Sequence, residues 1–153
     1  MSSAFEAITV GESISGKPFT ASAEHTQNFA DASLDYNPLH FDKEYMKGNF
    51  GKTTFGDVIM HGMQNFSVIS RTLIDYVMER GGCHRRLETR WLKPVKQGDT
   101  IIAKAVVTDK LQTAKSKWVT FDVSVTNQRD EVVAKAQAMA EFPDEFPWGP
   151  PKN

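Results

Sequence analysis

The sequence predicts an α+β domain with an antiparallel sheet that carries its helices on one face. The most apolar segment of the chain has the spacing of a helix and ends at Gly81-Gly82. After this stop the period of the apolar residues changes to two, in several consecutive segments. Helices that come first and strands that follow one another indicate an antiparallel sheet with its helices on one face.

The length of 153 residues is that of one domain, with a core expected over about residues 7–142 and a proline-rich tail over residues 143–153. Lys and Arg (18) nearly balance Asp and Glu (19), which argues against a protein that binds nucleic acid or an anionic membrane through bulk charge. No apolar run approaches the roughly 20 residues that a membrane span requires.

The single cysteine, Cys83, excludes an internal disulfide and a cysteine-based zinc site. The first residues, which include Glu6 and Glu12, lack a basic segment followed by an apolar one, so we expect no secretory signal. These observations predict a cytoplasmic, single-domain protein without a structural metal.

The N-terminal part is expected to contain short extended segments and one helix. Residues 7–10 and 14–19 fit extended segments that glycines interrupt. Ser22 is a suitable N-cap for the following helix, and Pro38 is expected to end it, because the residue before a proline disfavours the helical conformation. One face of this helix is expected to consist of Phe29, Ala30, Ser33 and Leu34.

A long polar segment, residues 41–57, connects this helix to the apolar one. A loop of that length inside a compact domain is more often functional than idle. The second helix, residues 63–78, is expected to be well buried, with Phe66, Ile69 and Leu73 in the core. Its other apolar positions at helical spacing are Met63, Ile74 and Val77.

The second half of the chain predicts four strands, at residues 84–95, 100–108, 116–126 and 132–142. One face of the last strand consists of small residues, which lets a helix approach closely, and residues 63–78 are the natural candidate. The inward faces of the last two strands are expected to be Val119, Phe121, Val123 and Val125, and Val132, Ala134, Ala136, Ala138, Ala140 and Phe142.

The stretch Leu34-Asp35-Tyr36-Asn37-Pro38-Leu39-His40 carries the strongest chemical signal. It places a carboxylate, Asp35, and an imidazole, His40, on either side of a rigid Asn-Pro turn. The two side chains can share one water, which the carboxylate orients and with which the imidazole exchanges a proton near neutral pH. The spacing alone leaves open that Asp35 is a solvated residue at a helix end.

The second signal lies at the entrance to the apolar helix. A glycine there, Gly62, leaves its N–H unpaired at the positive end of the helix dipole, which suits a developing oxyanion. Close packing of the helix on the sheet would explain the same glycine. We expect His61 to have a supporting or structural role. A metal site formed by His40 and His61 is not expected, since no third ligand with suitable spacing appears.

Together these stretches resemble the MaoC-like hydratase/dehydratase family, the (R)-specific enoyl-CoA hydratases with a hot-dog fold. The resemblance extends over about residues 10–142 and is most specific in the Asp-x-Asn-Pro-Leu-His stretch. It is carried by Phe29-Ala30, Asp35-x-Asn37-Pro38-Leu39-His40, His61-Gly62-Met63, Leu92-Lys93-Pro94-Val95 and Gly98-Asp99.

The resemblance implies a hot-dog fold, in which an antiparallel sheet wraps around a central long helix, and a homodimer whose protomers pair their sheets, with a higher homo-oligomer as the alternative. It also implies reversible hydration of trans-2-enoyl-CoA thioesters to (R)-3-hydroxyacyl-CoA. Asp35 and His40 would activate the water that adds to C3, and the Gly62 N–H would hold the thioester carbonyl as it gains enolate character. No metal, flavin or nucleotide redox cofactor is implied. The supporting roles implied are a turn shaped by Asn37, a contact from Ser67 to the carboxylate, and an acyl pocket that includes residues 47–54.

Two alternatives stay open. A hot-dog acyl-CoA thioesterase would direct the water at the carbonyl carbon, and a non-catalytic subunit would only bind the acyl thioester. The intact spacing of Asp35 and His40 favours the hydratase. We expect no catalytic role for His25 or Cys83. Five basic residues fit either the phosphates of coenzyme A or a solvated strand edge: Arg85, Arg86, Arg90, Lys93 and Lys96.

Overall fold

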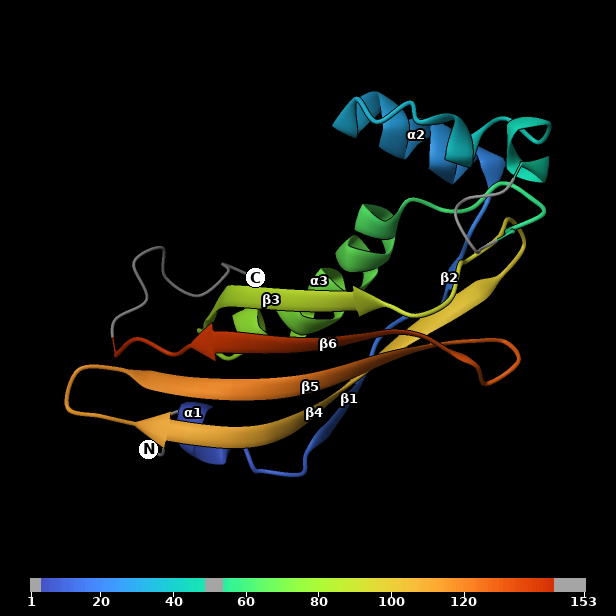
Figure 1. The fold of residues 1–153 in the computed structure, drawn as a ribbon. Helices are drawn as coiled ribbons and strands as arrows, with labels where there is room; N and C mark the ends of the chain where they lie inside the picture. Colours follow the sequence, from blue (N-terminus) through green and yellow to red (C-terminus); the bar gives the residue numbers. More distant parts are fainter. Residues whose placement is uncertain (1–3, 49–53, 145–153) are drawn as a thin grey trace.

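The computed structural model describes residues 4–48 and 54–144, and within these ranges the strands form one six-stranded sheet (Figure 1). Its strands are β1 (Ser13–Ser15), β2 (Phe19–Thr20), β3 (Cys83–Trp91), β4 (Thr100–Gln112), β5 (Lys117–Asn127) and β6 (Val132–Glu141). Every pairing between them is antiparallel. The order is β1-β4-β5-β6-β3, with β2 also beside β4, so consecutive strands β4, β5 and β6 form a meander.

The long apolar helix, α3 (Gly62–Glu79), packs on one face of this sheet (Figure 1). Its side chains Ile69, Leu73 and Val77 are fully buried. The backbone of α3 comes closest to β3 and β4, which lie on either side of the β5–β6 pair. The predicted α+β architecture is confirmed, and so is the burial of Val119, Phe121, Val123, Val125, Ala134, Ala136, Ala138, Ala140 and Phe142. Val132 is the exception and is only half-buried, because a register shift between β5 and β6 falls next to it and Val133 is buried in its place.

Three details of these elements differ from the expectation. β4 continues to Gln112 and does not end at residue 108, because its pairing with β5 extends to Lys117. β3 ends at Trp91 and not at residue 95, because Pro94 has no N–H to donate to a strand ladder. Phe66 is only half-buried and lies on the outer side of α3, where Ser70 and Ile74 neighbour it. A helix that covers a sheet buries one face, and Phe66 falls outside that face.

The N-terminus forms a short helix, α1 (Ala4–Ala7), instead of the expected extended segment. Phe5 and Ile8, three residues apart, both enter the core, and the Phe5 ring lies 6.0 Å from that of Phe142. Two apolar residues at this spacing share one side of a helical turn, whereas in a strand they would point to opposite faces. The core therefore begins at Phe5.

Gly16 divides the expected segment 14–19 into β1 and β2. A Cβ atom at this position would lie 2.2 Å from Oγ1 of Thr72 in α3 and 3.1 Å from the carbonyl oxygen of Ala103 in β4. The Gly16 N–H donates to that carbonyl at 2.8 Å. The chain passes so close to α3 and β4 here that only a residue without a side chain fits.

The first long helix, α2 (Ala23–Ser33), has the expected N-cap, since Oγ of Ser22 accepts a backbone N–H of its first turn. It ends earlier than expected. Leu34 takes a left-handed conformation with φ of 61° and closes the helix, so Pro38 does not end it. Because the chain has already left the helix, Leu34 is 77% exposed and is not part of the buried face.

Two 3-10 turns follow, η1 (Pro38–His40) and η2 (Tyr45–Lys47), and the second buries Met46 completely. Residues 49–53, within the segment 47–54 expected near the acyl pocket, lie outside the described residues, as do residues 145–153 of the tail. In the described ranges, none of the helices has the length and apolarity needed to cross a membrane.

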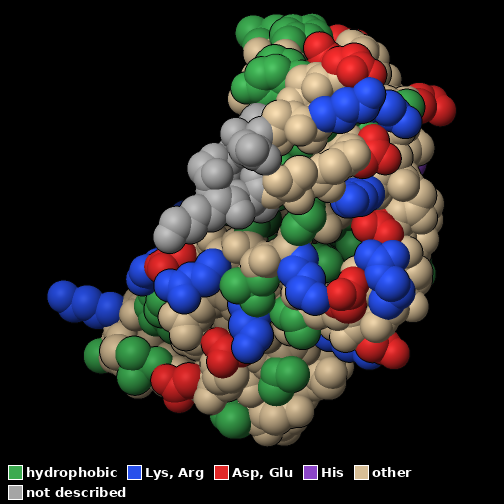
Figure 2. Space-filling view, turned by 45° about the vertical axis from the view of Figure 1, so that its right-hand side comes forward, with side chains coloured by type: hydrophobic (Ala, Val, Ile, Leu, Met, Phe, Trp, Pro, Cys, Tyr) green, Lys and Arg blue, Asp and Glu red, His purple; other side chains and the backbone are tan. Residues whose placement is uncertain are grey.

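Charged side chains of both signs are interspersed on the face seen in Figure 2. Several of them form ion pairs, such as Arg85 with Glu141 at 2.8 Å. This mixture agrees with the formal net charge of −1.

Candidate active site

The turn after α2 is shaped by two side chains that accept hydrogen bonds from the backbone. Oδ1 of Asp35 accepts the N–H of Asn37 at 3.2 Å, and Oδ1 of Asn37 accepts the N–H of Leu39 at 3.1 Å and caps η1. Asp and Asn favour such turns because a short polar side chain can replace a backbone acceptor. The other carboxylate oxygen of Asp35, Oδ2, faces His40.

His40 is held by the segment that leads into α3. Its Nδ1 lies 2.7 Å from the carbonyl oxygen of Ile59, and because a carbonyl only accepts, Nδ1 carries the proton. The neutral imidazole then has its lone pair on Nε2, 4.0 Å from Oδ2 of Asp35. This separation is too long for a direct hydrogen bond but lets one water contact both atoms.

The surroundings of His40 favour its neutral form. Burial lowers the pKa of His40 below the ordinary value of 6.5, and the neighbouring His61 adds to this effect. The hydrogen bond to Ile59 and the Asp35 carboxylate oppose it. At neutral pH the imidazole is therefore largely unprotonated, which is the form that accepts a proton.

His61, the N-cap residue of α3, is buried beside the pair. Its Nε2 lies 2.9 Å from the backbone oxygen of Asp35, so Nε2 carries a proton and donates it. The His61 and His40 rings stack with their centroids 3.7 Å apart. Nδ1 of His61 is buried and accepts no hydrogen bond from any described residue. His61 thus fixes the backbone of Asp35 and the ring of His40 together.

Gly62 opens α3, and no hydrogen bond among the described residues uses its N–H. The indole of Trp91 in β3 donates to the Gly62 carbonyl at 3.0 Å. A Cβ atom on residue 62 would lie 3.0 Å from Cε2 of that indole. The glycine therefore allows close packing of α3 against Trp91, which is one of the two explanations considered for it above. Because Gly62 is also the first residue of the helix, its N–H has no partner within the helix.

These groups meet in one pocket with a volume of about 470 Å³. Asp35 is not among the lining residues and reaches the pocket through His40. An apolar cavity with a few polar groups on its wall is typical of a small-molecule site and is suited to an apolar acyl group. Its walls are formed by Leu39, His40, Phe55, Ile59, Met60, His61, Gly62, Asn65, Trp91, Leu92, Lys93, Pro94 and Val95.

Residues 5–129 match the family described as MaoC-like domain. The chain belongs to the MaoC-like family. It is 31% identical over 139 residues to an (R)-specific enoyl-CoA hydratase of Rhodospirillum rubrum, with 91% of each chain covered. It is 26% identical over 122 residues to a 3-hydroxybutyryl-CoA dehydratase of Methylorubrum extorquens, covering 80% of this chain and 73% of that one.

Among solved structures, the R-hydratase PhaJ1 of Pseudomonas aeruginosa, in its unliganded form, has a TM-score of 0.77 and 27% identity. The match covers 92% of this chain and 86% of that chain. The sheet and helix described above are therefore the hot-dog fold of the MaoC-like family. The protein is an enzyme of the hydratase and dehydratase class.

Within this MaoC-like chain, Ser67 does not come together with the other predicted site residues. Its Oγ donates to the Met63 carbonyl at 3.0 Å, and the side chain lines a separate hollow between α3 and the β1–β2 segment at Lys17 and Phe19. Five residues after Gly62, it is turned away from that glycine by about 140° around the helix axis. Its contact with the Asp35 carboxylate stays a prediction.

Asn65 is a pocket residue that the sequence reasoning missed. It is 2% exposed and lines the same pocket as Gly62. Its Oδ1 is buried and has no hydrogen-bond partner in the described ranges. Its spacing of three from Gly62 and four from His61 places it on their side of α3, and this signal was available in the sequence.

The structure supplies a third potential metal ligand, which the sequence reasoning did not find. Asp35, His40 and His61 each place one potential ligand atom in the same region, and these three atoms all lie within 4.8 Å of one another. The two imidazole planes, however, make an angle of only 25°, with their centroids 3.7 Å apart. Imidazole lone pairs lie in the ring plane, so in nearly parallel stacked rings they do not converge on one ion. This donor set does not fit a tetrahedral metal.

Three of the five residues in the predicted basic run form ion pairs, and one of these three also lines the pocket. Arg85 binds Glu141, Arg86 binds Glu88 at 2.9 Å, and Lys93 binds Glu131 at 2.7 Å. Of the five residues of the run, only Lys93 lines the pocket. The structure therefore favours the solvated strand edge for Arg85 and Arg86.

Proposed function

We propose that this MaoC-like protein catalyses the reversible hydration of trans-2-enoyl-CoA thioesters to (R)-3-hydroxyacyl-CoA, with Asp35 and His40 activating the water. One observation carries the proposal. The hydrogen bond from Nδ1 of His40 to Ile59 leaves Nε2 as an acceptor, 4.0 Å from Oδ2 of Asp35, at the wall of an apolar pocket. The relatives named as hydratase and dehydratase support the same chemistry.

In the hydration direction, the oxygen of the water forms a bond to C3 of the substrate. One of its protons passes to Nε2 of His40, while the Asp35 carboxylate orients the water. The electron pair of the C2–C3 double bond shifts toward the thioester carbonyl, whose oxygen gains enolate character. Return of a proton from the imidazolium to C2 completes the addition of one water, and the reverse sequence is dehydration.

Gly62 is proposed to stabilise the enolate-like oxygen. Its N–H lies at the N-terminus of the 18-residue helix α3, where the helix dipole is positive. A preorganised donor acts mainly on the charge that develops in the transition state. His61 is proposed to support the pair, because it binds the Asp35 backbone and stacks on His40.

Purified protein mixed with crotonyl-CoA tests the proposal. We expect loss of the conjugated absorbance without release of free thiol, and the (R) configuration at C3 of the product. Release of thiol with the double bond intact would instead identify a thioesterase. No change in either signal would identify a protein that only binds the thioester. Branched and dicarboxylic enoyl-CoA substrates in the same assay define the acyl group.

We also propose a homodimer. β3 lies at one end of the strand order, and no described strand pairs with its outer side. An unpaired edge favours association with another strand. The outer side of α3 also exposes apolar side chains, with Met63 51%, Ile74 38% and Met78 40% accessible. Pairing of two protomers would cover both features.

The third part of the proposal is a cytoplasmic location. The chain carries one free cysteine, Cys83, and no disulfide, as is usual in a reducing compartment. Cell fractionation with an antibody to the natural protein checks it, and recovery from the culture medium or from an exported fraction would contradict it.

A further inference from the structure

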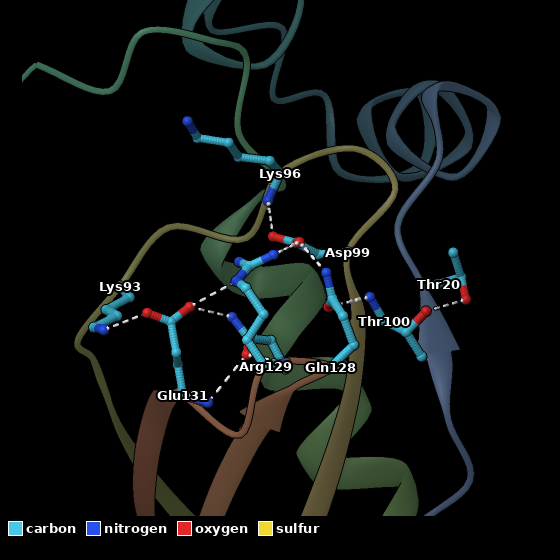
Figure 3. A network of polar contacts seen from close by, with 9 residues as sticks. Thr20, Lys93, Lys96, Asp99, Thr100, Gln128, Arg129 and Glu131 are labelled. Carbon is cyan, nitrogen blue, oxygen red and sulfur yellow. Dashed lines mark hydrogen bonds and ion pairs between the residues drawn. The ribbon is translucent and has the colours of Figure 1, made fainter.

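The loop between β3 and β4, residues 92–99, is anchored by a buried carboxylate (Figure 3). Asp99 is 6% exposed, and its Oδ1 accepts from Nε2 of Gln128 at 2.7 Å and from Nη1 of Arg129 at 3.0 Å. Its Oδ2 accepts the backbone N–H of Lys96 at 3.0 Å. Although burial opposes it, these hydrogen bonds hold the pKa of Asp99 below its usual value.

A second carboxylate ties the start of the same loop to the β5–β6 hairpin. Glu131 accepts from Nζ of Lys93 at 2.7 Å, from Nε of Arg129 at 3.0 Å and from Nδ2 of Asn127 at 2.8 Å. Arg129 therefore contacts both carboxylates (Figure 3). The loop is held from the hairpin at two places, near Lys93 and at Asp99.

This loop in turn holds the segment that supports His40. Lys96 forms an antiparallel bridge with Ile59, and the N–H of Met60 donates to the carbonyl oxygen of Val95 at 2.7 Å. On the other side, the N–H of Ile59 donates to Leu39 at 3.1 Å and the carbonyl of Ile59 accepts from His40. The Ile59 peptide groups thus lie between the anchored loop and the candidate base.

We propose that Asp99, together with Arg129, is a positioning residue that sets the tautomer and orientation of His40 through the Lys96–Ile59 bridge. The Ile59 carbonyl is outside any regular helix or strand, so its place depends on these few hydrogen bonds. The tautomer of an imidazole is decided by the hydrogen bond that its other nitrogen makes. A shift of the Ile59 carbonyl away from the ring would free Nδ1 and let the proton occupy Nε2, which then could not accept one.

The other charged and titratable groups near His40 come from different elements and do not replace this contact. Asp35 faces Nε2, His61 stacks on the ring, and Lys93 on the pocket wall has its Nζ bound to Glu131. Only the Ile59 carbonyl receives the Nδ1 proton in the described structure.

The test is nitrogen-15 NMR of histidine-labelled protein, which reports the His40 tautomer without any substrate. In the parent we expect His40 with its proton on Nδ1. Asp99→Asn should raise the fraction protonated on Nε2. Arg129→Met, at an exposed residue, should do the same to a smaller extent and serves if Asp99→Asn does not fold. The matched control is Arg85→Gln, which breaks the 2.8 Å ion pair with Glu141 at the opposite end of β6 and should leave the tautomer unchanged.

In the hydration assay, Asp99→Asn should lower kcat by about 10- to 100-fold, the usual effect of a small misplacement of a catalytic group, with KM changed much less. The inference rests on the proposed function only for this second readout. An unchanged His40 tautomer in a folded Asp99→Asn protein, or an equal change in Arg85→Gln, overturns it while the hydratase proposal stands. A changed tautomer in a protein without hydratase activity overturns the proposed function and leaves the positioning role intact.

Discussion

The geometry of Asp35 and His40 leads to a double-mutant cycle with a defined outcome. Asp35→Asn keeps an oxygen that can accept the Asn37 N–H, now at 3.2 Å, so the turn is retained while the charge is lost. His40→Gln keeps an amide that can donate toward Ile59 and removes the titrating ring. Each change should lower kcat by about 10²–10⁴, the usual contribution of general acid–base catalysis. This corresponds to about 2.7–5.4 kcal/mol in the activation free energy.

The double variant distinguishes a shared water from two separate effects. Independent contributions would multiply to a loss of about 10⁴–10⁸ in kcat. Because Nε2 of His40 and Oδ2 of Asp35 are only 4.0 Å apart, both can contact one water, and removal of either should disable it. We therefore expect the double variant to lose about as much activity as the worse single variant.

The assay follows the conjugated absorbance of crotonyl-CoA, with thermal unfolding measured on the same samples. The Asp35 side chain is 48% exposed, so its interaction with His40 contributes little to the free energy of unfolding and both variants should fold. Near-parental hydration by either single variant would refute the mechanism. A double-variant loss equal to the product of the single losses would refute the shared water.

Three further predictions concern the helix entrance, the pH profile and the dimer. Gly62→Ala keeps the N–H but places a methyl group 3.0 Å from the Trp91 indole, which should shift the helix start and misplace the donor. We expect kcat to fall by about 10²–10³, the range for loss of one oxyanion donor, and parental turnover by a folded variant would contradict the assignment of Gly62. Because burial lowers the pKa of His40, hydration should hold its rate as the pH falls to 6.5 and decline only below it, so a pH–rate profile that bends above 6.5 would contradict the assignment. Light scattering should show a dimer for the parent and for the control Leu111→Lys, at a 54% exposed site, but a monomer for Ile74→Lys on α3, and a monomeric parent would exclude the dimer.

The long elements of this fold could be predicted because each has a local signal. The apolar period of α3, its stop at Gly81-Gly82 and the alternation along β5 and β6 depend only on neighbours in the sequence. The Ser22 cap is local in the same sense. The short elements were misjudged where a tertiary contact decides them. α1 forms because Phe5 reaches the core beside Phe142, and Gly16 separates two strands because Thr72 of α3 comes so close.

The candidate site divides in the same way. The motif from Asp35 to His40 and the glycine at the start of α3 were visible as residue types at fixed spacing, because turn and helix-end chemistry is local. The tertiary contacts that these residues make could not be predicted from the spacing. His61 was expected only to support the site, and its contact with the backbone of Asp35, 26 residues away, requires that α2 and α3 meet at their ends.

The sequence by itself determined the fold class and the family, and it singled out Asp35 and His40 as the candidate pair. Only the tertiary structure decided that His40 accepts at Nε2, since the carbonyl that takes its other proton belongs to Ile59, 19 residues further along. It also decided why residue 62 is glycine, because the indole above it comes from Trp91, 29 residues away in β3. Periodicity and caps record contacts within a few residues, whereas a partner supplied by another strand depends on sheet order and register, which short-range patterns do not encode.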